Sequence, residues 1–308
     1  MRLLTYNCCA LPVLAGDIKA RLELVGSEIV ELDPDVVVMQ EVFLPRHFRL
    51  LQGALRDWSH SFSGVRPWRS FAGGLAVFSK FPLVEPRFVR FQHQGPLLRY
   101  SALARLSRKG IVSTLVRPPS APPFRLVTTH PVADYRMWRS GEAGPDAKGA
   151  RSTPEYLWKR LALARGDPYP ELQAGQMADL TRHVLASGRD LPLVVAGDLN
   201  VVPSSGLLRG FLASTGLRDC MEGCLEPSMV TGKYYRLPYH GAPNKRIDYV
   251  LVRDGSRERF TLRSARYVLD RKAGPGGLRC ATLSDHLGVL VELSLSMDCV
   301  GDKPEWRC

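Results

Sequence analysis

Four short stretches, far apart in the chain, each place a carboxylate where an apolar, strand-like run ends or begins. They are VVVMQE, LVVAGDLN, KRIDYVLV and TLSDHLGVLVEL, with Glu41, Asp198, Asp248 and Asp285 as the acidic residues. Asn7, after LLTY, and His130, after LVTT, end two further runs of this kind. Hard cations such as Mg²⁺ are held by one or two carboxylates together with substrate phosphate. The pattern therefore predicts one metal-assisted site assembled from several strand ends.

Two of these stretches carry a second polar residue near the carboxylate, Asn200 in LVVAGDLN and His286 in TLSDHLGVLVEL. Each of these residues indicates what its stretch could do in a reaction. Asp198 and Asn200 are two residues apart, so in an extended chain both point to the same side and could hold metal, phosphate and an attacking water. Asp248 lies in an apolar run, where a carboxylate is costly to bury unless it is paired, and His286 is the leading partner. A carboxylate bonded to one ring nitrogen raises the basicity of the other, as a general base requires.

Each of these residues also has a structural interpretation. Glu41 could be a solvated strand end, GDLN an Asx turn, and His130 a buried structural histidine. The functional interpretation depends on all of them occurring in one chain.

The composition favours a soluble globular protein with an anionic partner. The chain has 308 residues, 45% of them hydrophobic and 23% charged, with a formal net charge of +12. Such a charge suits nucleic acid, an acidic membrane surface or a phosphorylated small molecule, and a merely soluble basic surface is the alternative. No apolar run reaches the roughly 18 residues of a membrane-spanning helix.

The termini and the cysteines leave the compartment open. The first residues lack the order of a signal peptide, so a cytoplasmic or peripheral membrane location is expected, or secretion if a leader was removed. The seven cysteines are too irregular for a zinc site or a disulfide framework. Cys299 and Cys308 could close the C-terminal loop as a disulfide in an oxidising compartment.

Strand-like runs alternate with helical stretches. Helices are expected over 17–32, 47–55, 170–187 and 206–212. The buried positions expected in the third of these are Leu172, Met177, Leu180, Val184 and Leu185. Many strands with a few helices indicate a layered α/β fold, which we expect to form one domain over 1–297 followed by a short tail over 298–308. The polar segment 140–154 is the best candidate for a mobile loop.

The ordered set TYN, QE, TH, GDLN, RIDY and SDH closely resembles the endonuclease/exonuclease/phosphatase superfamily. The resemblance runs from Asn7 to about Leu295. It implies a four-layer α/β/β/α sandwich with two packed mixed sheets. It also implies a magnesium-dependent phosphoesterase, with Mn²⁺ or Co²⁺ as possible substitutes.

The resemblance implies which residues bind the metal ion and which residue is the general base. Glu41 is similar to the principal Mg²⁺ ligand, and Asn7 and Asp285 resemble its supporting ligands. His286 looks like the general base, oriented by Asp248.

The remaining residues resemble those that bind the substrate. Asp198 and Asn200 are similar to the pair that holds the attacking water and the phosphate. His130 resembles the donor to a phosphoryl oxygen or to the leaving group, and Asn7 is a further substrate contact. The reaction implied is in-line attack of water on a phosphodiester.

Segments between the motifs are most similar to the neutral sphingomyelinase branch. They are GGLAVFSKFPL, the Lys109-Gly110 turn, THPVADY and AGDLNVVPSS. Pro131, Val132 and Asp134 depart from that branch. This similarity implies an enzyme that acts on a phospholipid membrane surface and releases phosphocholine from sphingomyelin. We expect the protein to be a monomer. The aromatic residues expected at the lipid interface, unless they pack within their own loop, are Tyr135, Trp138, Tyr156, Trp158 and Tyr169.

Two other hypotheses belong to different classes. The net charge suits a metal-dependent nuclease acting on DNA or RNA. A catalytically silent lipid- or protein-binding scaffold is the third hypothesis, and the complete set of site residues argues against it.

Overall fold

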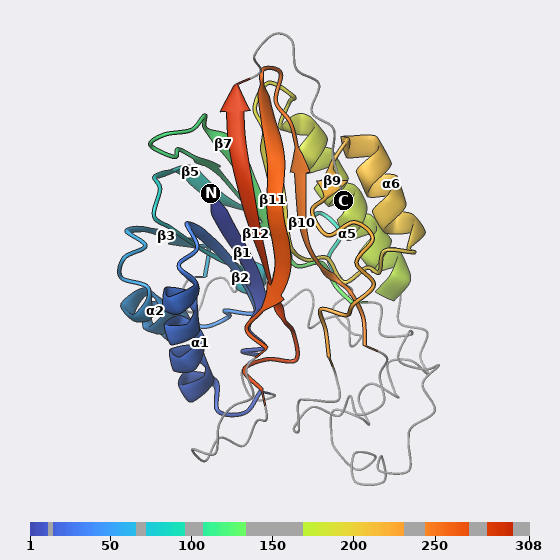
Figure 1. Cartoon of the computed structure of the whole chain (residues 1–308). Helices are drawn as coiled ribbons and strands as arrows, with labels where there is room; N and C mark the ends of the chain where they lie inside the picture. The colour runs from blue at the N-terminus through green and yellow to red at the C-terminus, as the bar shows by residue number, and fades with distance from the viewer. Residues whose placement is uncertain are drawn as a thin grey trace.

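The computed structural model describes residues 1–11, 15–65, 72–95, 107–133, 169–230, 244–270 and 282–297. In this part of the chain, two six-stranded sheets pack face to face, with helices on the outer face of each (Figure 1). The first sheet has the order β11-β12-β1-β2-β4-β3 and the second the order β5-β6-β7-β8-β10-β9. In both sheets parallel and antiparallel pairs are mixed. The expected four-layer α/β/β/α sandwich is confirmed.

The strands of the first sheet are β1 (Arg2–Asn7), β2 (Val36–Gln40), β3 (His60–Ser63), β4 (Ala76–Ser79), β11 (Glu258–Val268) and β12 (Gly288–Met297). Those of the second are β5 (Leu83–Arg90), β6 (Gly110–Val116), β7 (Phe124–Thr129), β8 (Leu193–Asp198), β9 (Arg218–Asp219) and β10 (Asp248–Arg253). The helices are α1 (Ile18–Leu32), α2 (Pro45–Ala54), the short 3₁₀ turn η1 (Ala72–Gly74), α5 (Tyr169–Ala186) and α6 (Gly206–Thr215). The four predicted helices are therefore present, with ends within a few residues of expectation, whereas the short strands β3 and β9 were not predicted.

Successive side chains of a strand point to opposite faces of its sheet, so the apolar residues form three cores. One core lies between the two sheets, and one lies between each sheet and its helices. On β1, Leu3 faces the other sheet while Leu4 and Tyr6 face α1 and α2. On β8, Val194 faces the other sheet while Val195 faces α5 and α6. Both faces of each sheet are covered, which explains why these strands read as continuous apolar runs.

Two expectations about the helix α5 need correction. Leu172, Met177, Leu180 and Val184 are buried as predicted, but Leu185 is exposed at 47% because it lies beyond the side that contacts the sheet. Tyr169, expected at a lipid interface, is buried against Val132 and Leu172.

Several predictions concern residues outside the described part of the chain. They are the loop 140–154, the tail 298–308 with Cys299 and Cys308, and the aromatic residues Tyr135, Trp138, Tyr156 and Trp158. The cysteines near the first strand, Cys8 and Cys9, are described and are buried free thiols. Among the described helices, none combines the length and hydropathy needed to cross a bilayer.

The packing between the two sheets predicts the cost of one truncation. Phe260 on β11 meets Phe124 on β7 edge to face, with ring centroids 6.1 Å apart. We expect Phe260→Ala to lower the free energy of unfolding by about 3–5 kcal/mol, because it removes this contact and leaves a cavity. Leu225→Ala is the control and should change stability by less than about 0.5 kcal/mol, since Leu225 is 93% exposed. Denaturant unfolding measures both, and equal values would contradict the prediction.

Candidate active site

The inter-sheet core becomes polar at one end, the lower end in Figure 1. On β8 and β10 the inward positions run from Val194 and Val252 to Asp198 and Asp248, which lie directly opposite each other in the ladder. On β1 the same alternation carries Leu3 through to Asn7. Strand periodicity thus points these side chains into one space between the sheets.

A polar layer separates this end from the apolar core. Gln40, the last residue of β2, donates through Nε2 to Thr5 Oγ1 at 3.2 Å and to Thr128 Oγ1 at 3.4 Å. Thr5 belongs to the first sheet and Thr128 to the second. Gln40 therefore joins the two sheets between the apolar core and the candidate site.

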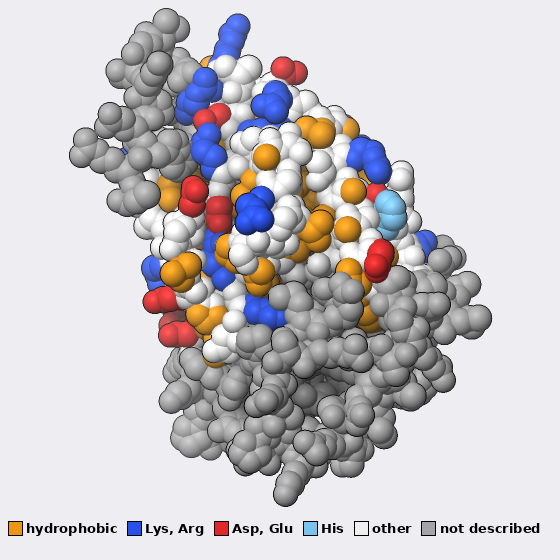
Figure 2. Space-filling model, turned by 90° about the vertical axis from the view of Figure 1, so that its right-hand side faces the viewer, with side chains coloured by type: hydrophobic (Ala, Val, Ile, Leu, Met, Phe, Trp, Pro, Cys, Tyr) orange, Lys and Arg blue, Asp and Glu red, His pale blue; other side chains and the backbone are white. Residues whose placement is uncertain are grey.

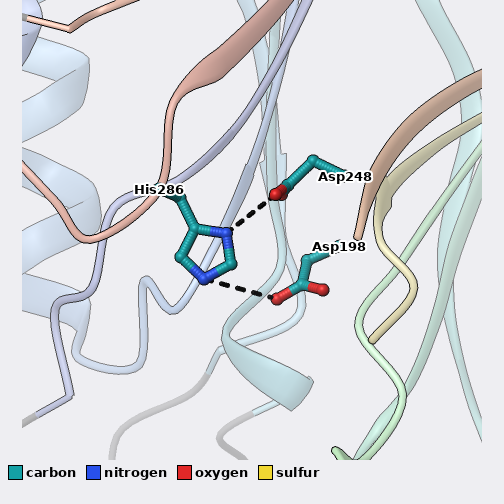
Figure 3. Close-up of side chains that lie close together, drawn as sticks. All are labelled: Asp198, Asp248 and His286. Atoms are coloured by element: carbon teal, nitrogen blue, oxygen red, sulfur yellow. Dashed lines mark hydrogen bonds and ion pairs between the residues drawn. The ribbon is translucent and has the colours of Figure 1, made fainter. Parts of the chain in front are cut away.

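His286 lies between two buried aspartates (Figure 3). Its Nδ1 is 2.8 Å from Asp248 Oδ2, and its Nε2 is 3.8 Å from Asp198 Oδ2. Burial alone would lower the pKa of His286, but the charges of Asp248, Asp285 and Asp198 outweigh it and raise the pKa well above its usual 6.5. The expected contact between Asp248 and His286 is present. Ser228 supports it, since its Oγ donates to Asp248 Oδ2 at 2.6 Å.

Asp198 is the carboxylate on which most contacts converge. Its Oδ2 accepts from Asn7 Nδ2 at 3.0 Å and is 3.4 Å from His130 Nε2, while its Oδ1 accepts from the backbone N–H of Asn200 at 2.8 Å. Burial and the neighbouring Asp248 raise the pKa of Asp198 to about 7. Gly197 precedes it, and an added Cβ there would run into the carbonyl oxygen of Thr129 on β7.

His130 differs electrostatically from His286. Burial and the nearby charges of Lys109 and His286 lower the pKa of His130 well below 6.5. A neutral His130 can donate from Nε2, whereas a protonated His286 holds a positive charge between the aspartates. The two histidines therefore differ in charge and in hydrogen-bonding capacity.

Glu41 lies beside this cluster. It follows β2 in a left-handed conformation, with φ 67°. Gly74 packs against this turn, where an added Cβ would come within 3.0 Å of the Glu41 Cα. Asn7 Nδ2 reaches Glu41 Oε1 at 3.4 Å, so that one amide links Glu41 to Asp198. Burial and the charge of Asp285 raise the pKa of Glu41.

The structure adds a cation, Lys109, which in the sequence stands only as a turn residue. Lys109 is buried immediately before β6, and burial lowers the pKa of its amine to about 8 although Glu41 and Asp198 act in the opposite direction. A lysine between an arginine and a glycine in a turn looks like an ordinary solvent-exposed residue. Its proximity to two distant carboxylates is visible only in three dimensions. Ser228 was missed for the same reason. Gln40 belongs to the QE motif but was assigned no role of its own.

The donor set suits a hard cation. Glu41 and Asp285 offer carboxylate oxygens. Burial and then the charge of Asp285 raise the pKa of Glu41, and a divalent cation would relieve the repulsion between the two carboxylates. Ligand atoms of Asp198, Asp248 and His286 lie within 4.8 Å of one another and form a second candidate group. Two buried atoms here, Asp248 Oδ1 and His130 Nδ1, have no hydrogen-bond partner among the described residues. Metal, water or substrate contacts would satisfy such atoms.

Comparison with known proteins places this arrangement in context. A sequence model described as "Endonuclease/Exonuclease/phosphatase family" matches residues 4–286. The chain is 27% identical over 205 residues to the inositol phosphosphingolipids phospholipase C of Schizosaccharomyces pombe, covering 67% of this chain and 42% of that protein. It is 24% identical over 306 residues to a putative neutral sphingomyelinase of Drosophila melanogaster, covering 96% and 61%. The chain thus spans about half the length of these curated relatives.

Among solved structures, sphingomyelinase C from Streptomyces griseocarneus has a similar fold. It superposes with a TM-score of 0.63 at 20% identity, covering 94% of this chain and 98% of that one. At this identity the likeness concerns the fold.

The charge environment of His286 generates a prediction about titration. Asp248→Asn should lower the pKa of His286, because it removes the nearest of the charges that raise it. The change is measured by following the ring resonances with NMR in metal-free protein. His47, buried on α2 with a pKa lowered to about 4, is the control and should not change. An unaltered titration of His286 in the variant would contradict the electrostatic account.

Proposed function

The chain belongs to the endonuclease/exonuclease/phosphatase family, and from that premise we propose that it is a magnesium-dependent phosphodiesterase of sphingomyelinase type. The proposed reaction converts sphingomyelin to ceramide and phosphocholine. The observation that carries it is the buried Asp198–His286–Asp248 cluster, with Glu41 and Asn7 beside it at the same strand ends.

In the proposed mechanism, Glu41 and Asp285 would hold Mg²⁺, with Asn7 beside them. Bound Mg²⁺ supplies Lewis-acid polarisation of a phosphoryl oxygen. Lys109 adds a buried positive charge next to Glu41 and Asp198, where it would stabilise negative charge developing on the phosphoryl oxygens. His130 would donate from Nε2 to a phosphoryl oxygen or to the leaving group.

His286 would act as the general base at Nε2. Asp248 holds Nδ1, so the free Nε2 faces the space that contains Asp198. The ring must be neutral to accept a proton from water, and its pKa must therefore fall from the metal-free value. Positive charge added beside Glu41 and Asp285 acts in that direction. Asp198 and Asn200 would orient the water and the phosphate.

The substrate assignment is supported by the relatives. One is named for inositol phosphosphingolipids and the other as a putative neutral sphingomyelinase. Both names point to a ceramide phosphodiester with a polar headgroup, which we take as the substrate class. The segments between the motifs resemble the same branch.

A nuclease is the second candidate, because the net charge of +12 suits a polyanion. Figure 2 shows the side of the molecule that carries α5 and α6. Its Lys and Arg side chains are interspersed with hydrophobic and other side chains instead of forming one continuous stripe. This face therefore gives the nuclease hypothesis no particular support.

A substrate panel with metal removal tests the proposal. Purified protein with Mg²⁺ should release phosphocholine from sphingomyelin, EDTA should stop the release, and added Mg²⁺ should restore it. Inositol phosphosphingolipid, plasmid DNA and RNA are assayed under the same conditions. Cleavage of nucleic acid without turnover of any sphingolipid would replace the proposal by the nuclease alternative.

Substitution of the proposed base separates an enzyme from a scaffold. His286→Ala should lower kcat by about 10²–10⁴-fold, since a positioned general base contributes that much. His60→Ala, on the strand β3 in the first sheet, is the control and should retain full turnover. Circular dichroism and thermal unfolding check that both variants fold. Equal activity of the two variants would remove His286 from the mechanism.

A further inference from the structure

The helix α5 buries a row of polar side chains. The spacing of its apolar residues does not explain why these polar side chains are buried. Gln173, Gln176 and Asp179 lie three residues apart, and they are only 6%, 0% and 6% exposed. Residues at this spacing are neighbours on one side of a helix. Burial of an amide or a carboxylate is costly without hydrogen bonds, so the partners of this row indicate its purpose.

Two members of the row bind the backbone of Val132. Gln176 Oε1 accepts from the Val132 N–H at 2.8 Å, and Gln173 Nε2 donates to the Val132 carbonyl at 2.9 Å. The strand β7 ends at Thr129, and Val132 lies beyond that end. The two glutamines bond the N–H and the carbonyl of Val132, as the backbone of a neighbouring strand would do within a sheet. His130 lies between Thr129 and this anchored residue, and its backbone is therefore held from both sides.

Gln173 also closes a ring of bonds around Asn200. Its Nε2 donates to the Asn200 carbonyl at 2.9 Å, and Asn200 Nδ2 donates to the Pro131 carbonyl at 3.0 Å. Pro131 leads directly to Val132, which returns to Gln173. The loop after β8 and the segment after β7 are consequently fixed to each other and to one side chain of α5.

The other end of the row extends towards Lys109. Gln176 Nε2 donates to the His93 carbonyl at 3.1 Å, and Asp179 Oδ2 accepts from the His93 N–H at 2.9 Å. The next residue, Gln94, donates through Nε2 to the Lys109 carbonyl at 3.1 Å. One helix side thus bonds the backbone at Asn200 and next to His130, and it is linked to Lys109 only indirectly, through His93 and Gln94.

We propose that Gln173 and Gln176 are positioning residues, which hold His130 and Asn200 in alignment with Asp198. The inference rests on the proposed function, because it assigns these glutamines a task in that reaction. Neither side chain contacts the aspartates, and each acts through the backbone of a site segment. A displacement of a catalytic group by about 1 Å can lower the rate about 10²-fold.

The first measurement tests the anchoring without any substrate. Gln176→Leu removes the acceptor of the Val132 N–H, so hydrogen exchange of that amide should become about tenfold faster. The control is Leu180→Ala, which truncates a fully buried apolar residue of the same helix and destabilises the protein without removing any of these bonds. The exchange of Val132 should change less in the control than in Gln176→Leu.

The second measurement separates positioning from stability. In the sphingomyelin assay with Mg²⁺, Gln173→Leu should lower kcat about 10²-fold and leave KM within about threefold. Substrate binding is retained in this variant, whereas the reacting groups are misaligned. Folded Leu180→Ala should keep the kcat of the parent protein. If Gln173→Leu does not fold, Gln173→Met has nearly the same size and length and removes both donor bonds.

The outcomes are distinguishable. Faster exchange of Val132 together with a selective loss of kcat supports the proposal. Unchanged exchange, unchanged kcat, or an equal kcat loss in Leu180→Ala overturns it. If the parent protein hydrolyses no phosphodiester, the proposed function fails. The anchoring is then decided by the exchange of Val132 and by the ring resonances of His130, which must shift in Gln176→Leu and stay in place in Leu180→Ala.

Discussion

Two aspartates opposite each other in one antiparallel ladder set the conditions for the rest of this site. Asp198 on β8 and Asp248 on β10 are register partners, and both are almost completely buried. Like charges directly across a sheet destabilise it, and a buried carboxylate without partners is costly. His286 lies between the two side chains and offsets their repulsion. Hydrogen bonds from Ser228, Asn7 and the Asn200 N–H stabilise the two carboxylates further. The fold therefore has to deliver a third segment, from just before β12, to this position.

This requirement connects the two sheets. β8 and β10 belong to the second sheet, whereas His286 leads into β12 of the first. Asn7, also from the first sheet, donates to Asp198, and Gln40 joins the sheets between the site and the apolar core. A shift of one sheet against the other would break all these bonds at once. The geometry of the site therefore depends on the packing of the apolar core that holds the two sheets in place.

The sequence predicts those parts of the site whose evidence lies within one short stretch of residues. A carboxylate at the end of an apolar run, as in LVVAGD, marks a strand end, and the family motifs order those ends. The Asp248–His286 contact was predictable because a buried carboxylate needs a partner. Lys109 was not predictable as a site residue, because its turn resembles an exposed one. Gln173 and Gln176 were hidden in a helix whose Leu and Met spacing already accounted for burial, and Leu185 was wrongly added to that face.

The balance of charge gives a physical reason for a cation that does not depend on family likeness. Four carboxylates, those of Glu41, Asp198, Asp248 and Asp285, face only two cationic groups of the described site, Lys109 and a protonated His286. The raised pKa values of Glu41 and Asp198 are the direct consequence of burial and this excess of negative charge. A phosphodiester is itself an anion, and the bare site would repel it. A divalent cation beside Glu41 and Asp285 would offset this excess of negative charge where the phosphate binds, and its charge would also act to lower the pKa of His286. Substrate binding and activation of the base would thus depend on the same ion.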